Sequence, residues 1–129
     1  MSEGTIRGRV LLAEDEPDIQ RLIELILSKA GLEVDLADDG NAACEMALAS
    51  QAEGRPYDLI LMNMLMPELN GFEATRRLRQ SGWKGPIIAL TAYAMPDDCD
   101  KCLQAGCDDY ISKPVDHEDL LAAVARHLG

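Results

Sequence analysis

The chain has 129 residues, of which 47% are hydrophobic, and a formal net charge of −11 at pH 7. This length suits one domain, residues 1–129, that buries roughly two thirds of its unfolded surface. The acidic balance argues against a nucleic-acid partner, which needs clustered Lys and Arg. No apolar run is long enough to span a bilayer and the N-terminus is polar, without a signal peptide, so we expect a cytoplasmic protein with no membrane partner.

Five apolar, strand-like runs alternate with five helical patterns. In chain order we expect a strand at Arg9–Ala13, a helix at Pro17–Ala30, a strand at Glu33–Leu36, a helix at Asn41–Ser50, a strand at Leu59–Met62, a helix at Gly71–Gln80, a strand at Pro86–Leu90, a helix at Pro96–Ala105, a strand at Asp109–Ser112 and a helix at Asp116–Leu128. This alternation predicts an α/β fold, in which helices cover both faces of a parallel sheet.

The apolar positions of the helices predict their buried faces. In the first helix they are Ile19, Leu22, Ile23, Ile26, Leu27 and Ala30, and in the last they are Leu120, Leu121, Val124 and Leu128. Pro17 suits the first turn of the first helix, and Gly31 suits the position that follows its end.

The cysteines are at positions 44, 99, 102 and 107. The Cys99-x-x-Cys102 spacing could indicate a metal or redox pair, but no second close pair completes a zinc site. Both residues fall on one helical stripe with Met95, Leu103 and Gly106. We therefore predict that Cys99 and Cys102 are reduced, face inward and bind no metal.

Polar residues follow the strands at the edge where parallel sheets bind ligands. These residues are Glu14, Asp15, Asn63, Thr91 and Lys113. Neighbouring carboxylates repel each other unless a cation joins them, and Mg²⁺ prefers such oxygen ligands. A lysine and a hydroxyl nearby could hold the oxygens of a phosphoryl group. The acidic run alone has a second interpretation, because acids before a helix also stabilise its dipole.

Four segments carry a resemblance that spans essentially the whole chain. They are Val10–Glu16, Leu59–Gly71, Ala89–Ala92 and Asp109–Pro114. In this order and spacing the chain resembles the receiver domain of two-component response regulators, in particular receivers attached to hybrid histidine kinases. The resemblance implies a flavodoxin-like (βα)5 doubly wound sandwich with a five-stranded parallel sheet in the order 2-1-3-4-5.

The resemblance also implies roles for individual residues. Asp15 would ligate Mg²⁺ directly, Glu14 would support it, and Asn63 and the backbone carbonyl of Leu65 would complete the metal site. Thr91 would sense a phosphoryl group and Lys113 would pair with it. Tyr110 would be the aromatic residue that turns inward on activation, and the Lys113–Pro114 peptide bond would be cis.

Asn63 departs from the family pattern, because the resemblance places a phosphate-accepting aspartate there. An amide is a poor nucleophile and carries no charge, so we expect no phosphorylation at position 63, weakened Mg²⁺ binding and no enzymatic activity. Two explanations stay open. The asparagine is either an engineered replacement or the native residue of a pseudo-receiver that acts as a phosphorylation-independent binding module.

The resemblance implies a histidine kinase or a histidine phosphotransfer domain as the partner in a phosphorelay. A homodimer through the face formed by the fourth and fifth helices is a further expectation. A flavodoxin-like flavin carrier is disfavoured, because the acidic run Glu14-Asp15-Glu16 would repel a flavin phosphate. A small phosphatase is disfavoured because it would need an aspartate nucleophile at position 63.

Overall fold

The computed structural model describes residues 7–64, 66, 70–91 and 96–128, and of residues 96–99 it describes the backbone alone. Its centre is a five-stranded sheet in the order β2-β1-β3-β4-β5. The strands are β1 (Arg9–Ala13), β2 (Glu33–Ala37), β3 (Leu59–Asn63), β4 (Ile87–Thr91) and β5 (Asp109–Ser112), and all neighbouring pairs are parallel. The carboxyl ends of all five strands therefore lie along one edge, which confirms the predicted fold class.

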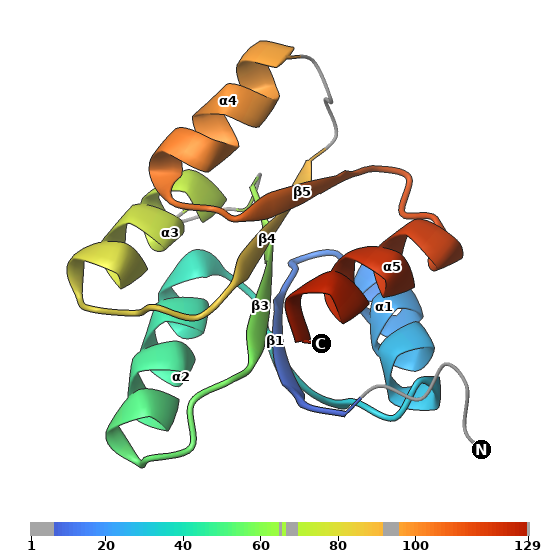
Figure 1. The fold of residues 1–129 in the computed structure, drawn as a ribbon, viewed down its shortest axis with the longest axis horizontal. Coiled ribbons are helices and arrows are strands. Elements are labelled where there is room, and N and C mark those ends of the chain that lie inside the picture. The colour runs from blue at the N-terminus through green and yellow to red at the C-terminus, as the bar shows by residue number, and fades with distance from the viewer. Residues whose placement is uncertain (1–6, 65, 67–69, 92–95, 129) are drawn as a thin grey trace.

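Five helices cover the two faces of this sheet (Figure 1). They are α1 (Pro17–Lys29), α2 (Gly40–Ala52), α3 (Gly71–Gln80), α4 (Pro96–Ala105) and α5 (His117–Leu128). Helices α1 and α5 lie on one face, and α2, α3 and α4 lie on the other (Figure 1). No helix among the described residues is long and apolar enough to cross a membrane.

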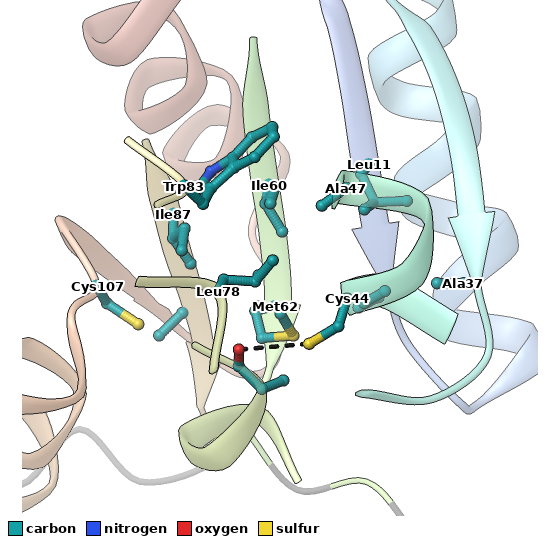
Figure 2. Close-up of a cluster of buried hydrophobic side chains, with 14 of the residues drawn as sticks. Leu11, Ala37, Cys44, Ala47, Ile60, Met62, Leu78, Trp83, Ile87 and Cys107 are labelled. Carbon is teal, nitrogen blue, oxygen red and sulfur yellow. Dashed lines mark hydrogen bonds between the residues drawn. The ribbon is translucent and has the colours of Figure 1, made fainter. Parts of the chain in front are cut away.

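Alternation along the strands builds one core on each face of the sheet. In β1, Val10 and Leu12 pack toward α1 and α5, whereas Leu11 and Ala13 pack toward α2 and α3. Figure 2 shows the second core, where Met62 of β3 lies beside Leu78 of α3 and Cys44 of α2. Because every residue of β3 and β4 is buried, these central strands read as continuous apolar runs.

Most predicted boundaries agree with the structure to within one or two residues. The two corrections of burial concern Leu22, which is 48% exposed, and Leu103, which is 50% exposed. Both lie on the predicted apolar stripes of their helices. The sheet covers only a narrower strip of each helix, centred in α1 on Ile23 and Leu27 and in α4 on Cys102.

The inward-facing part of the cysteine prediction is confirmed for Cys102. Cys102 is fully buried, and Cys44 and Cys107 are buried as well. The side chain of Cys99 lies outside the described part of the chain. No group of His, Cys, Asp and Glu among the described residues forms a metal cluster.

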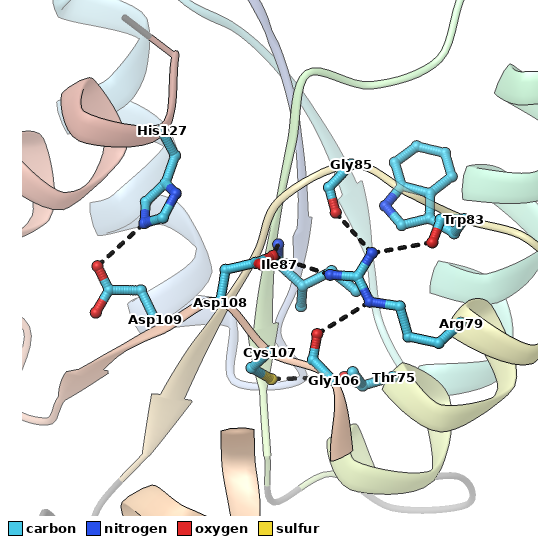
Figure 3. Close-up of polar contacts among 10 residues, drawn as sticks. All are labelled: Thr75, Arg79, Trp83, Gly85, Ile87, Gly106, Cys107, Asp108, Asp109 and His127. Carbon is cyan, nitrogen blue, oxygen red and sulfur yellow. Dashed lines mark hydrogen bonds and ion pairs between the residues drawn. The ribbon is translucent and has the colours of Figure 1, made fainter. Parts of the chain in front are cut away.

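Arg79 fastens α3 to the segments that precede β4 and β5 (Figure 3). Its guanidinium donates to the backbone oxygens of Trp83, Gly85 and Gly106, each at 2.9 Å. It also donates to the Asp108 carboxylate at 2.9 Å. One planar side chain with several donors thus fixes the end of the sheet opposite to the polar strand ends.

Candidate functional site

The side-chain amide of Asn63 lies between two carboxylates. Asn63 is the last residue of β3 and is only 2% exposed. Its Nδ2 donates to Glu14 Oε2 at 3.0 Å and to Asp15 Oδ1 at 3.1 Å. The end of β1 and the end of β3 are therefore joined by one NH₂ group, which has two protons for its two acceptors.

Glu14 is the most enclosed ionisable group of this site. Its side chain has no exposed surface, and its Oε2 also accepts a hydrogen bond from the Glu16 backbone N–H at 3.1 Å. Burial raises the pKa of Glu14, and the charge of Asp15 adds to this effect. The Glu16 N–H and the ammonium of Lys113 act in the opposite direction, because both stabilise the ionised form.

Lys113 closes the site from the side of β5. Its Nζ lies 3.4 Å from Glu14 Oε1 and forms an ion pair with it. Its backbone N–H donates to Thr91 O at 2.7 Å, so the residue that follows β5 is tied to the end of β4. The Lys113–Pro114 peptide bond is cis, as predicted.

The structure brings four of the predicted site residues into contact. Glu14, Asp15, Asn63 and Lys113 form one connected cluster. Thr91, which is 6% exposed, ends the neighbouring strand.

The other two predicted site residues are Tyr110 and Leu65. Tyr110 is 39% exposed on β5, so its ring is not enclosed in the core. Leu65, whose carbonyl was expected to complete the metal site, lies outside the described residues.

Two residues that the sequence did not reveal as part of the site, Gln20 and Asp38, support the cluster. Gln20 of α1 donates through Nε2 to the backbone oxygen of Glu14 at 2.9 Å and to Asp38 Oδ1 at 3.1 Å. Asp38 directly follows β2, so the strand-end rule applied to the second strand would have found it. Gln20 gave no comparable signal, because a glutamine within a helix is usually a solvated residue.

Gly71 forms the wall of the site behind Asn63. It begins α3, and its N–H donates to Met64 O at 3.2 Å. A Cβ at this position would collide with Asn63 O and would lie 2.7 Å from Met64 Cα. Only glycine lets α3 start so close to the end of β3, and this contact fixes the backbone that carries the amide.

The donor chemistry of the site fits a hard divalent cation. Glu14 and Asp15 supply carboxylate oxygens of the kind that Mg²⁺ prefers, and the buried Glu14 Oε1 has no hydrogen-bond partner among the described residues. However, the amide nitrogen of Asn63 is hydrogen-bonded to both carboxylates. The ligands for a cation are present, but a donor from the protein already engages them.

The response regulator receiver domain family matches residues 10–125 of the chain. The chain belongs to this family. It is a receiver domain of two-component phosphorelay signalling, with the strand order that defines the receiver fold.

Relatives of the receiver domain occur both as parts of large kinases and as small proteins. A hybrid signal transduction histidine kinase of Dictyostelium discoideum is 42% identical over 114 residues, which cover 85% of this chain and 7% of that protein. A two-component response regulator of Oryza sativa subsp. japonica is 41% identical over 121 residues and 92% of each chain. The chain thus spans a small part of the first relative and almost all of the second.

One similar solved structure comes from a receiver domain with a bound metal ion. The receiver domain of a Pseudomonas aeruginosa PAO1 sensor histidine kinase is 41% identical, with a TM-score of 0.83 over 95% of this chain and 98% of that chain. That structure contains a magnesium ion coordinated in its active site cleft.

Proposed function

We propose that this receiver domain takes part in a phosphorelay as a binding partner that does not accept a phosphoryl group at position 63. The observation that carries the proposal is the position of Asn63. It ends β3 within hydrogen-bonding distance of Glu14 and Asp15, where the resemblance places the acceptor aspartate.

The chemistry of acceptance requires an anionic oxygen that attacks phosphorus. A carboxylate has such an oxygen and forms an acyl phosphate, whereas a neutral amide has none. The Asn63 nitrogen is also occupied as a hydrogen-bond donor. We therefore propose that the chain has neither self-phosphorylation nor dephosphorylation activity.

Magnesium binding belongs to the same proposal. Glu14 and Asp15 would hold Mg²⁺, which when bound neutralises charge around a phosphoryl group. Binding is proposed to be weaker than in a receiver with an aspartate at position 63, because the cluster has one negative charge fewer. Lys113 and Thr91 would face the oxygens of a bound anion.

The proposed partner is a histidine kinase or a histidine phosphotransfer domain. The likeness to receivers of hybrid kinases supports this class of partner. A homodimer through the face of α4 and α5 is also proposed, and the exposed Leu103 of α4 and Tyr110 of β5 support it. Light scattering at several protein concentrations would test the dimer.

A second candidate function is a phosphorylation-independent binding module. The specific observation in its favour is that groups of the protein itself, from Asn63, Glu16 and Lys113, engage the acidic pair. Under this reading the site serves only to hold the ends of β1, β3 and β5 together.

Phosphorylation of the Asn63→Asp variant distinguishes the two functions. The unmodified chain and the variant are incubated with acetyl phosphate and Mg²⁺, and intact mass reports an added phosphoryl group. We expect no addition to the unmodified chain and one addition to Asn63→Asp, because the chain has Glu14, Asp15, Thr91 and Lys113 at or just after the ends of β1, β4 and β5. If Asn63→Asp gains no phosphoryl group, the result would favour the binding module. Phosphorylation at position 63 of the chain that keeps Asn63 would contradict both functions.

A further inference from the structure

We infer that the Asn63 side chain takes the place of a divalent cation, joining the Glu14 and Asp15 carboxylates from within the protein and competing with metal for them. The inference rests on the proposed function, since it concerns the same site. It goes further by giving Asn63 a role of its own. Asn63 acts as a plug, which here means a side chain that occupies the carboxylates a cation would bind.

The first argument is the convergence of two negative groups on one nitrogen. Glu14 and Asp15 are consecutive residues, and consecutive side chains of a regular strand point to opposite faces. Here the chain leaves β1 after Ala13, and both carboxylates reach Asn63 Nδ2, at 3.0 and 3.1 Å. Such convergence of like charges is costly unless a cation or a shared donor lies between them.

The second argument is the match between donors and acceptors. A primary amide has two N–H protons, and each carboxylate takes one of them. The other oxygen of Glu14 faces Lys113 at 3.4 Å, and the Glu16 N–H adds a bond to Glu14 Oε2. The described residues therefore supply each carboxylate with a hydrogen-bond donor, Glu14 at a buried location and Asp15 at a partly buried one.

The Asn63 amide points its nitrogen, and not its oxygen, at the two carboxylates. A cation would need the amide oxygen of Asn63 turned toward it, which requires the NH₂ group to leave both carboxylates. Turned inward without a cation, that oxygen would face two anions. The orientation that stabilises the metal-free protein is thus the orientation that opposes metal binding.

Two readings of Asn63 now make opposite predictions for its removal. If Asn63 contributes an amide oxygen to the metal, Asn63→Ala should bind Mg²⁺ more weakly than the unmodified chain. If Asn63 is a plug, Asn63→Ala should bind more tightly, because no hydrogen bonds have to break before the cation enters. Asn63→Asp binds most tightly in both cases, so the alanine variant decides.

The experiment is isothermal titration with MgCl₂ of the unmodified chain, Asn63→Ala, Asn63→Ser and Asn63→Asp. Asn41→Ala is the matched control, because Asn41 is an exposed residue of α2 that accepts from Arg77 outside the site. We expect Asn63→Ala to bind Mg²⁺ about tenfold more tightly than the unmodified chain, the factor that corresponds to about 1.4 kcal/mol, or about one net hydrogen bond. Asn41→Ala should bind as the unmodified chain does.

If Asn63→Ala does not fold, Asn63→Ser replaces it in the test. Its hydroxyl keeps the position polar but cannot donate to both carboxylates. It should also bind Mg²⁺ more tightly than the unmodified chain. If folded Asn63→Ala and Asn63→Ser bind Mg²⁺ equally to or more weakly than the unmodified chain, the inference that Asn63 is a plug is overturned. That result would leave the proposed function intact, because phosphorylation of position 63 is measured independently by mass.

Discussion

The contact between Gly71 and the end of β3 gives a sharp test of how the fold positions Asn63. In Gly71→Ala the new methyl group would collide with the backbone oxygen of Asn63 and lie 2.7 Å from Met64 Cα. Ordinary contact begins near 3.4 Å, so the contact with Met64 Cα alone requires the backbones to separate by about 0.7 Å (3.4 − 2.7), and the closer contact with Asn63 O requires more. Backbone atoms of a buried strand cannot rotate away as a flexible side chain can.

The expected cost follows from the overlap and from one hydrogen bond. Overpacking of this kind costs about 1–3 kcal/mol, and the bond from Gly71 N–H to Met64 O adds about 1 kcal/mol when it is stretched. We therefore expect Gly71→Ala to lower the free energy of unfolding by about 2–4 kcal/mol in urea denaturation.

Gly54→Ala is the matched control for this prediction. Gly54 has a φ of +79° and nothing within 4 Å of an added Cβ, so alanine there has backbone strain without overlap. That strain costs about 1–2 kcal/mol. A Gly71→Ala variant more stable than Gly54→Ala would refute the claim that close backbone approach fixes this end of β3.

Three further predictions concern residues outside the site. Burial alone would raise the pKa of Asp109, but hydrogen bonds from Arg126 and other donors lower it. The ionised carboxylate therefore stabilises the fold at pH values above the ordinary pKa of 3.8, and this stability is lost as the pH falls through the lowered pKa. Asp109→Asn should therefore cost about 0.5–1 kcal/mol at neutral pH in urea melts, and the difference should disappear in acid. Burial raises the pKa of Cys107 to about 12, so this thiol should not react with an aromatic disulfide reagent, followed by mass, until the protein unfolds. Arg79→Ala should lower the free energy of unfolding by about 2–4 kcal/mol, since it strands carbonyl acceptors and Asp108, and Arg79→Lys should recover little because one ammonium cannot replace the planar fork.

The fold could be predicted because its signals are local. Strands such as Leu59–Asn63 are buried on both faces and read as apolar runs, and glycine and proline mark several of the helix ends. Burial of single helix positions was less accessible. Leu22 and Leu103 fit the apolar stripes of their helices, yet about half of each residue remains exposed because the sheet covers only part of each stripe.

The site could be predicted in its members but not in its hydrogen bonds. The rule that parallel strands present ligands at their carboxyl ends placed Glu14, Asp15, Asn63 and Lys113 together. That the amide nitrogen would bond to both carboxylates depends on how the chain turns after β1, which no local pattern encodes. Gln20, the residue that links this turn to the end of β2, was missed for the same reason.

The central claim is that the amide of Asn63 holds the two carboxylates as a cation would, and its own protons report this most directly. In ¹H–¹⁵N spectra, assigned by the signals that Asn63→Asp removes, we predict that both Nδ2 protons of Asn63 resonate downfield and exchange slowly with solvent. Each is hydrogen-bonded to a carboxylate, and Asn63 is only 2% exposed. These signals should persist in millimolar Mg²⁺. Protons that exchange as in a free amide, or that lose their protection as soon as Mg²⁺ is added, would contradict the account.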